Sequence, residues 1–151
     1  MTARFSVRPL RPADMDSILA IERAGFGADA YDRNLFAEYE RICPGLFLVA
    51  QGARGVAGYS IAWVVSGRPT LANLISIAVL PEARGTGAAS LLLNSTVRRL
   101  KLRGVDRLTL TVRRSNARAI RFYERHGFTA LRRAPRYYED GEDGLLMRRD
   151  L

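Results

Sequence analysis

The stretch from Leu71 to Arg114 constrains the fold more than any other part of the chain. An apolar run, LANLISIAVL, leads into the glycine-rich PEARGTGAAS and then into residues 86–103, whose apolar positions have helical spacing. After Gly104, residues 105–114 alternate polar and apolar side chains, which is typical of a strand with one buried face. A strand, a helix and a second strand in this order predict a crossover connection and parallel pairing of the two strands.

The segments on either side predict a mixed sheet with helices packed against it. Residues 46–80 contain three runs rich in valine, isoleucine and aromatic residues, and the turn-forming GARG and SGRPT between them predict an antiparallel meander. A last hairpin is expected around the polar loop EDGED. Helices are expected at residues 12–24, 32–42, 86–103 and 117–126, and strands at residues 5–10, 46–51, 55–65, 71–80, 105–114, 128–135 and 144–151. The sequence therefore predicts a single domain over residues 1–151, α/β (mixed α+β) in class, with about seven strands and about four helices.

Composition excludes several classes of protein. Cys43 is the only cysteine, so a disulfide framework within the chain is excluded and a reducing, cytoplasmic location is expected. No run approaches the roughly 18 apolar residues of a membrane span, and the first residues lack a signal-peptide pattern. Cys43 has no histidine or cysteine near it in the sequence, so neither a metal site nor an acyl-cysteine is predicted. The single histidine, His126, is expected to face solvent at a helix end.

The formal net charge of +9 favours acidic partners such as phosphorylated cofactors, nucleic acid or ribosomes. Of the 24 basic residues only Lys101 is a lysine, so codon composition is an alternative source of the charge. Because no basic run is interleaved with aromatic residues, nucleic acid is not the expected partner.

The junction PEARGTGAAS has the residues that a phosphate site needs. The first turn of a helix presents unpaired N–H groups and a partial positive charge, and glycine lets a phosphate approach the backbone. The spacing Arg84-x-x-Gly87-x-Ala89 adds small residues to that turn and a guanidinium before it, so the junction can hold a pyrophosphate. It is neither a Rossmann fingerprint nor a P-loop, because the third glycine and the Gly-Lys-Ser/Thr sequence are missing. A tight turn that merely uses glycine is the alternative.

Together with TVRRSNARAIRFYERHGF further along, this junction resembles the paired acyl-CoA motifs of the GNAT acetyltransferase superfamily. The resemblance covers residues 5–151 and is strongest from Asn73 onward. The run RYYEDGEDGLLM, residues 136–147, resembles the C-terminal hairpin of ribosomal-protein alanine N-acetyltransferases. The resemblance implies a GNAT-like fold and an acyltransferase that needs acetyl-CoA and no metal, and that acetylates a primary amine by direct transfer.

The resemblance also implies which residues bind acetyl-CoA. Ile77, Ala78 and Val79 match the strand whose backbone pairs with pantetheine and polarises the thioester carbonyl, while their side chains can also fill a core. Asn116 matches an asparagine that contacts the cofactor, and it is also a favourable helix N-cap. The pyrophosphate loop is matched by Arg84, Gly85, Thr86, Gly87, Ala88, Ala89 and Ser90.

Tyr123 matches the tyrosine that protonates the departing CoA thiolate. The alternative is a core tyrosine, because Tyr123 shares a helix face with Ala119 and Ile120. The general base departs from the pattern, since relatives of the alanine-acetylating type carry glutamate in "LEVRxSN" where this chain has Thr111. Threonine does not accept a proton at neutral pH. Its presence favours a water relay or an acceptor that is an α-amine, whose pKa is about 8.

The acceptor side carries weaker signals. Tyr31, Tyr137 and Tyr138 match segments that line the acceptor groove, or else they are exposed aromatic loop residues. Glu22 and Glu139 are the carboxylates that could replace the missing base. The region around Tyr31 lacks the "PW" of the alanine-specific enzymes, so the ribosomal substrate is not fixed by the resemblance.

The leading hypothesis is an acetyl-CoA-dependent N-acetyltransferase whose acceptor is the α-amine of a peptide or protein N-terminus, a ribosomal protein being one such partner. A small amine, such as a polyamine or an aminoglycoside, is the alternative acceptor. A catalytically weak basic module that binds the ribosome or RNA is the alternative from another class. A monomer and a homodimer both fit the sequence.

Overall fold

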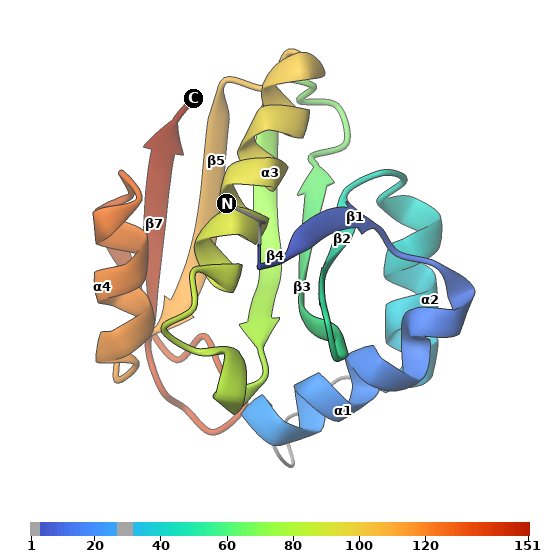
Figure 1. The fold of residues 1–151 in the computed structure, drawn as a ribbon. Helices are drawn as coiled ribbons and strands as arrows, with labels where there is room; N and C mark the ends of the chain where they lie inside the picture. Colours follow the sequence, from blue (N-terminus) through green and yellow to red (C-terminus); the bar gives the residue numbers. More distant parts are fainter. Residues whose placement is uncertain (1–3, 27–31) are drawn as a thin grey trace.

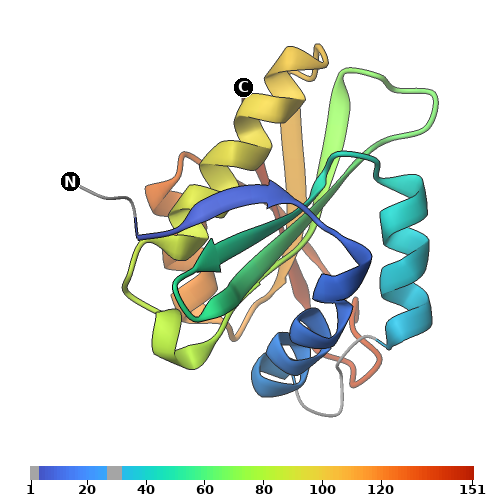
Figure 2. The same ribbon diagram turned by 45° about the vertical axis from the view of Figure 1, so that its right-hand side comes forward.

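The computed structural model describes residues 4–26 and 32–151, and over these residues the chain forms a seven-stranded sheet with four α-helices (Figures 1 and 2). The elements follow the order expected from the sequence. The strands are β1 (Ser6–Pro9), β2 (Phe47–Gly52), β3 (Gly55–Val64), β4 (Leu71–Val79), β5 (Arg107–Arg113), β6 (Thr129–Ala134) and β7 (Gly144–Asp150). The helices are α1 (Met15–Phe26), α2 (Arg33–Ile42), α3 (Ala88–Leu102) and α4 (Ala117–Arg125), with the short 3-10 turns η1 (Pro12–Asp14) and η3 (Pro81–Ala83).

The strand order is β1-β2-β3-β4-β5-β7-β6. Strands β2, β3 and β4 form the expected antiparallel meander, and β1 adds to the free edge of β2. Strands β4 and β5 are parallel and are joined through α3, so the predicted crossover is confirmed. Strands β6 and β7 form the predicted C-terminal hairpin, with β7 inserted between β5 and β6.

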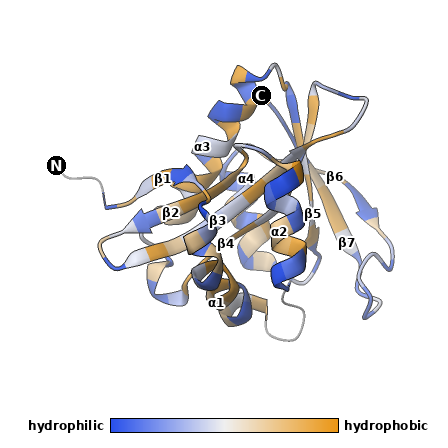
Figure 3. Ribbon diagram, turned by 90° about the vertical axis from the view of Figure 1, so that its right-hand side faces the viewer, coloured by the Kyte–Doolittle hydropathy of each residue, from blue (hydrophilic) through white to orange (hydrophobic). Residues whose placement is uncertain are grey.

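Helices cover both faces of the sheet. Tyr59 and Ser60 are neighbours on β3 and therefore point to opposite faces. Tyr59 packs edge-on against Phe36 of α2, with ring centroids 5.6 Å apart, whereas the Ser60 hydroxyl lies 3.1 Å from that of Thr96 in α3. Figure 3 shows apolar colour gathered on the strands and the sheet-facing sides of the helices. Among the residues that the structure describes, no helix has the length and hydropathy required to cross a membrane.

Strands β4 and β5 are paired only at their beginnings. The parallel register runs from Leu71 opposite Arg107 to Asn73 opposite Thr109. Beyond this point the two strands diverge, as Figure 1 shows. The sheet is therefore continuous at one end of these strands and split at the other.

A β-bulge in β4 lies at the start of this split. Ala62 of β3 is opposite Leu74, and Ile61 is opposite Ser76, so Ile75 is an extra residue without a partner on β3. A bulge bends its strand and increases the local twist. The bulge thus gives a physical reason why β4 turns away from β5 after its third residue.

The clearest differences from the expected helix boundaries are at α1 and α3. The first helix begins with η1 and continues through Gly25 to Phe26, because a glycine near a helix end costs only about 1 kcal/mol relative to alanine. The third begins at Ala88 rather than Thr86. Gly87 before it has a φ of 89°, a left-handed conformation that can flank a helix but cannot form part of it.

The start of α1 is tied to β1 by an ion pair. The two terminal nitrogens of Arg8 donate to the two carboxylate oxygens of Asp14 at 2.7 and 2.9 Å, and the backbone N–H of Arg11 donates to the same carboxylate at 2.7 Å. The hydrogen bonds from Arg8 lower the pKa of Asp14 below its ordinary value. This buried carboxylate fixes the direction in which α1 leaves the sheet.

Candidate functional site

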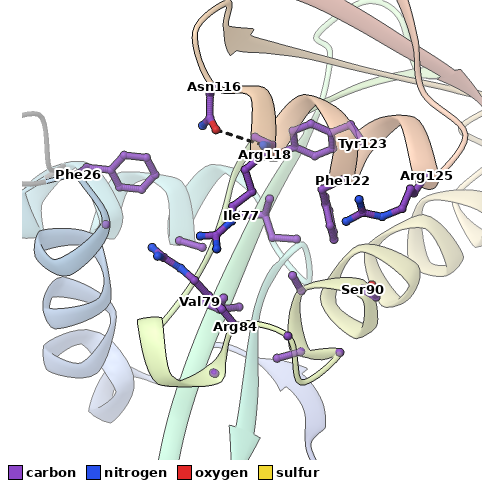
Figure 4. Close-up of a pocket in the computed structure, with 18 residues that line it drawn as sticks. Phe26, Ile77, Val79, Arg84, Ser90, Asn116, Arg118, Phe122, Tyr123 and Arg125 are labelled. Carbon is purple, nitrogen blue, oxygen red and sulfur yellow. Dashed lines mark hydrogen bonds between the residues drawn. The ribbon is translucent and has the colours of Figure 1, made fainter.

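A cavity of about 570 Å³ lies where β4 and β5 diverge, lined by residues of α1, β4, the loop before α3, α3 itself and α4. Figure 4 shows its lining residues. The sequence-predicted site residues that line it are Ile77, Ala78, Val79, Arg84, Gly85, Gly87, Ala88, Ala89, Ser90, Asn116 and Tyr123. The strand, the loop and the helix that the sequence assigned to one site thus meet around one space.

Four of the other predicted residues, all of them described, do not line the cavity. Thr86 lies in the same loop, but its hydroxyl donates to a backbone carbonyl of η3 and braces the turn. Thr111 lies on β5, and Tyr137 and Tyr138 lie in the β6–β7 loop. Tyr31 lies outside the described residues.

The loop between η3 and α3 forms an open wall of the cavity. Gly85 and Gly87 have φ of 76° and 89°, and a Cβ on either would meet no atom within 4 Å. Gly87 flanks α3 without a side-chain cap, so the N–H groups of Ala88 and Ala89 in the first turn have no helical partner. Free N–H groups at a helix N-terminus, next to open space, favour an anion such as a phosphate.

Three arginines surround the same space. Arg84 precedes the loop, Arg118 and Arg125 lie on α4, and Figure 4 shows Arg84 and Arg118 reaching toward each other. Within residues 4–26 and 32–151, no ion pair involves any of the three. Because like charges without acidic partners attract an anion between them, these arginines fit a phosphorylated ligand.

The sequence reasoning missed the two arginines of α4. They lie two helical turns apart, so the sequence already placed them on one face of the helix. Such a pair could have been recognised as part of the site.

Asn116 caps α4, as expected, and also lies at the cavity. Its side-chain oxygen accepts the N–H of Ala119 at 3.1 Å, the dashed bond in Figure 4, and the residue also lines the cavity. His126 corrects the sequence-based expectation, because it is half-buried rather than in solvent. Its Nδ1 lies 2.8 Å from the Phe122 carbonyl and its Nε2 lies 3.0 Å from the Ser90 hydroxyl. The imidazole therefore connects α4 to the first turn of α3, a contact that helical spacing alone does not reveal.

Tyr123 is only 9% exposed, yet it lines the cavity. Its ring packs edge-on against Phe122 and Phe128, with centroids 5.4 and 5.5 Å away. Burial raises the pKa of Tyr123 far above its ordinary value, and the nearby Tyr138 phenol adds to the effect. The side chain is thus a packed tyrosine that also lines the cavity, and its phenol is neutral at pH 7.

The β6–β7 loop is held against the end of β5 by Arg113. A terminal nitrogen of Arg113 donates to Asp140 at 2.8 Å and to Glu142 at 2.9 Å. The guanidinium also lies 4.1 Å from the centroid of the Tyr138 ring, which in turn packs edge-on against Tyr137. The two tyrosines expected at the acceptor side are therefore positioned by one cationic side chain.

The carboxylates considered as replacements for the missing base occupy different environments. Glu139 is exposed in the β6–β7 loop. Glu22 is only 2% exposed, within α1, and accepts a hydrogen bond from the phenol of Tyr59. Among the described residues, no group of histidine, cysteine and acidic side chains could hold a metal ion.

Comparison with known proteins identifies similar sequences and folds. The model of the Acetyltransferase (GNAT) family matches residues 14–128. An N-alpha-acetyltransferase from Saccharolobus solfataricus is 34% identical over 157 residues, which cover 97% of this chain and 93% of that protein.

Solved structures have the same architecture. Ard1 from Thermoplasma volcanium has a TM-score of 0.92 and 26% identity, with 99% of each chain covered. The ribosomal-protein-S18-alanine N-acetyltransferase from Escherichia coli has a TM-score of 0.82 and 29% identity, covering 97% of this chain and 93% of that one. The fold expected from the sequence is therefore confirmed.

Proposed function

The chain belongs to the GNAT acetyltransferase family, and we propose that it transfers the acetyl group of acetyl-CoA to the α-amine of a peptide or protein N-terminus. One observation carries the proposal. The cavity at the β4–β5 split gathers the anion-binding turn of α3, the edge of β4 and Tyr123 around one space. The relatives named N-alpha-acetyltransferase and ribosomal-protein-S18-alanine N-acetyltransferase align along almost the whole chain, which supports the same class of acceptor.

The residues of the cavity fit the donor. The first turn of α3 provides hydrogen-bond donors for its phosphates. Arg84, Arg118 and Arg125, which have no ion-pair partner in the part of the chain that the structure describes, add positive charge. The open space at Gly85 and Gly87 lets a phosphate approach the backbone. When bound, acetyl-CoA supplies a thioester whose carbonyl carbon can be attacked by an amine.

Strand β4 can polarise that carbonyl. After Asn73 the edge of β4 no longer pairs with β5, so N–H groups beyond this point are not used in that ladder. Ile77, Ala78 and Val79 lie in this part of β4 and line the cavity. Backbone N–H groups fixed in a sheet can stabilise charge on a carbonyl oxygen by about 3 kcal/mol per donor without reorganising.

Tyr123 can donate a proton to the CoA sulfur as it leaves. Its raised pKa keeps the phenol protonated at every physiological pH, so its O–H is always available to donate. A hydrogen bond from Tyr123 to the sulfur stabilises the charge that appears as the C–S bond breaks. The phenol can then pass its proton to the sulfur. The proton that the amine loses as the amide forms restores the phenol.

The acceptor side suits an amine that needs modest help to lose its proton. An α-amine has a pKa near 8, against about 10.4 for a lysine side chain, so a larger fraction is neutral at pH 7. Thr111 supplies no carboxylate, which suits an α-amine better than a lysine side chain. Arg113 holds Tyr137 and Tyr138 beside this side of the site, where aromatic rings can contact an extended peptide.

The test is the release of CoA with a panel of acceptors. We expect peptides that begin with alanine or serine, including one from the N-terminus of a ribosomal protein, to be acetylated at the α-amine. The same peptides with a blocked N-terminus and an internal lysine are the matched control and should remain unmodified. Acetylation of a polyamine or an aminoglycoside with no reaction of any peptide would contradict the proposed acceptor.

A further inference from the structure

A buried acid lies one helical turn from the cavity. Glu22 is 2% exposed and precedes by one turn Phe26, which lines the cavity. The fully buried Tyr59 of β3 donates its phenolic O–H to Glu22 Oε2. The Tyr59 oxygen also lies 3.1 Å from the hydroxyl of Ser76 on β4. Side chains from α1, β3 and β4 thus form one continuous hydrogen-bonded chain.

The hydrogen bonds of this chain have a defined direction. An ionised carboxylate only accepts, so Tyr59 donates to Glu22. Because a phenol has one proton, the remaining bond of Tyr59 must be accepted from Ser76. The Ser76 oxygen keeps lone pairs for a further donor, so a proton delivered to it can be passed on toward Glu22.

The bulge at Ile75 decides which face Ser76 occupies. Ser76 lies opposite Ile61, which shares its face of the sheet with Tyr59. Ala78, two residues further along β4, shares this face and lines the cavity. Half-buried Ser76 is therefore next to the cavity wall on the side covered by α1.

We propose that Ser76, Tyr59 and Glu22 form a proton relay that deprotonates the acceptor amine, in place of the carboxylate that Thr111 does not provide. The inference rests on the acetyl-transfer function proposed above but not on the identity of the amine. Ser76 is the residue that contacts the amine, Tyr59 transmits the proton, and Glu22 receives it.

The proton and electron balance is complete without another reactant. The bound ammonium gives one proton to Ser76, whose own proton moves to Tyr59, and the proton of Tyr59 moves to Glu22. The neutral amine then forms the C–N bond, the C–S bond breaks, and the second amine proton ends on the sulfur. After the products leave, Glu22 returns a proton to Tyr59, Tyr59 passes one to Ser76, and Ser76 releases one to water.

Glu22 lies where α1 packs against the sheet and α2. A buried carboxylate is costly to keep charged, and protonation removes that charge. On the sheet, β4 carries no ionisable residue and β3 contributes Tyr59. Among the described residues, α1 also carries the exposed Asp16 and Arg23, and η1 carries Asp14, which is paired with Arg8. Tyr39 of α2 and Cys43 after it are at least partly buried, and burial raises the pKa of both. The charged residues of α2 are the at least partly exposed Arg33, Glu38, Glu40 and Arg41.

Replacement Glu22→Gln tests the end of the relay. The amide oxygen still accepts the hydrogen bond of Tyr59, but it does not take a proton. We expect kcat at pH 7 to fall about 100-fold, as for loss of a general base, with the acetyl-CoA Kd from calorimetry unchanged. The loss should shrink toward pH 9, where most of an amine of pKa about 8 is already neutral.

Two further variants separate proton transfer from folding. Tyr59→Phe keeps the ring packing and interrupts the relay in its middle, so it should show the same loss and the same rescue at high pH. Ser60→Ala is the matched control, because it removes a buried hydroxyl on the adjacent residue that faces α3 instead. We expect Ser60→Ala to lower Tm with little change in kcat.

The assay uses whichever primary amine the wild-type protein acetylates. An amine other than an N-terminus would contradict the proposed acceptor while still testing the relay. Unchanged kcat in Glu22→Gln would overturn the relay. With an α-amine as acceptor, an equal loss at pH 7 and pH 9 would also overturn it, because it would indicate a structural role alone.

Discussion

The donor side and the acceptor side of the cavity are built by different means. On the donor side, backbone groups of the first turn of α3 and of the edge of β4 line the cavity and offer N–H donors. Small residues keep these groups accessible. On the proposed acceptor side, side chains from α1, β5 and the β6–β7 loop are held by hydrogen bonds and ion pairs, as at Glu22 and Arg113. Recognition of the donor therefore depends on chain conformation, and recognition of the acceptor depends on which side chains are present.

Tyr123 lies between the two sides and gives the largest expected effect. Tyr123→Phe should lower kcat about 100-fold, since it removes the O–H and keeps the ring that packs against Phe122 and Phe128. The acetyl-CoA Kd from calorimetry should not change. Tyr39→Phe, at another partly buried tyrosine that does not line the cavity, is the control and should keep wild-type kcat. Full activity of Tyr123→Phe would remove this residue from the chemistry.

Gly87→Ala tests whether the donor side depends on backbone conformation. A side chain at φ 89° strains the turn by about 1–2 kcal/mol, and the N–H groups before α3 should shift, raising the acetyl-CoA Kd about tenfold. Gly67→Ala is matched, because Gly67 has φ 75° in the β3–β4 turn and an equally open Cβ position, outside the cavity. Both variants should lose similar stability in urea titrations. Equal Kd values in the two variants would contradict a donor site made by the backbone.

Asp14→Asn tests the anchoring of α1, which carries part of the acceptor side. Because the folded-state pKa of Asp14 is lowered, its ionised form stabilises the fold above the unfolded pKa of about 3.9, and this contribution disappears as pH falls through the lowered value. At pH 7 the variant should unfold with about 1 kcal/mol less free energy than the wild type. Below pH 4 the difference in urea titrations should close. A difference that is constant with pH would contradict an ionic origin.

Arg113→Ala gives the smallest expected effect. Loss of its contacts with Asp140, Glu142 and Tyr138 should loosen the β6–β7 loop and raise the peptide KM about threefold. A change of this size corresponds to the free energy of a partly exposed ion pair. The acetyl-CoA KM should stay constant. Arg107→Ala, at the other end of β5, is the control and should change neither constant. A rise in the acetyl-CoA KM alone would show that the two sides are not separately built.

The same contrast explains how much the sequence could predict. Most cavity-lining residues of the donor side could be predicted, because the turn and the strand before it are continuous in the sequence. Small residues in that order are also typical of a phosphate-binding turn. Arg118 and Arg125 were missed because a charged residue on a helix is usually solvated, and only the fold shows what the helix faces.

The acceptor side could not be assembled in this way. The run NLISIAVL has polar residues only at Asn73 and Ser76, so it shows no regular alternation that Ile75 would interrupt. Glu22 and Tyr59 come from separate elements, and nothing in either local pattern indicates that the two meet. His126 likewise reached Ser90 through the packing of two helices that no local spacing predicts.

Because of the bulge at Ile75, the arrangement of part of this site depends on the number of residues in β4. An in-frame loss of that codon would leave every other amino acid in place, yet it would restore strict alternation along β4. Ser76 and Ala78 would then change faces relative to the residues before them. Point substitutions at Ile75 keep the residue count and therefore the register. We expect natural variation in this strand to consist of substitutions rather than insertions or deletions.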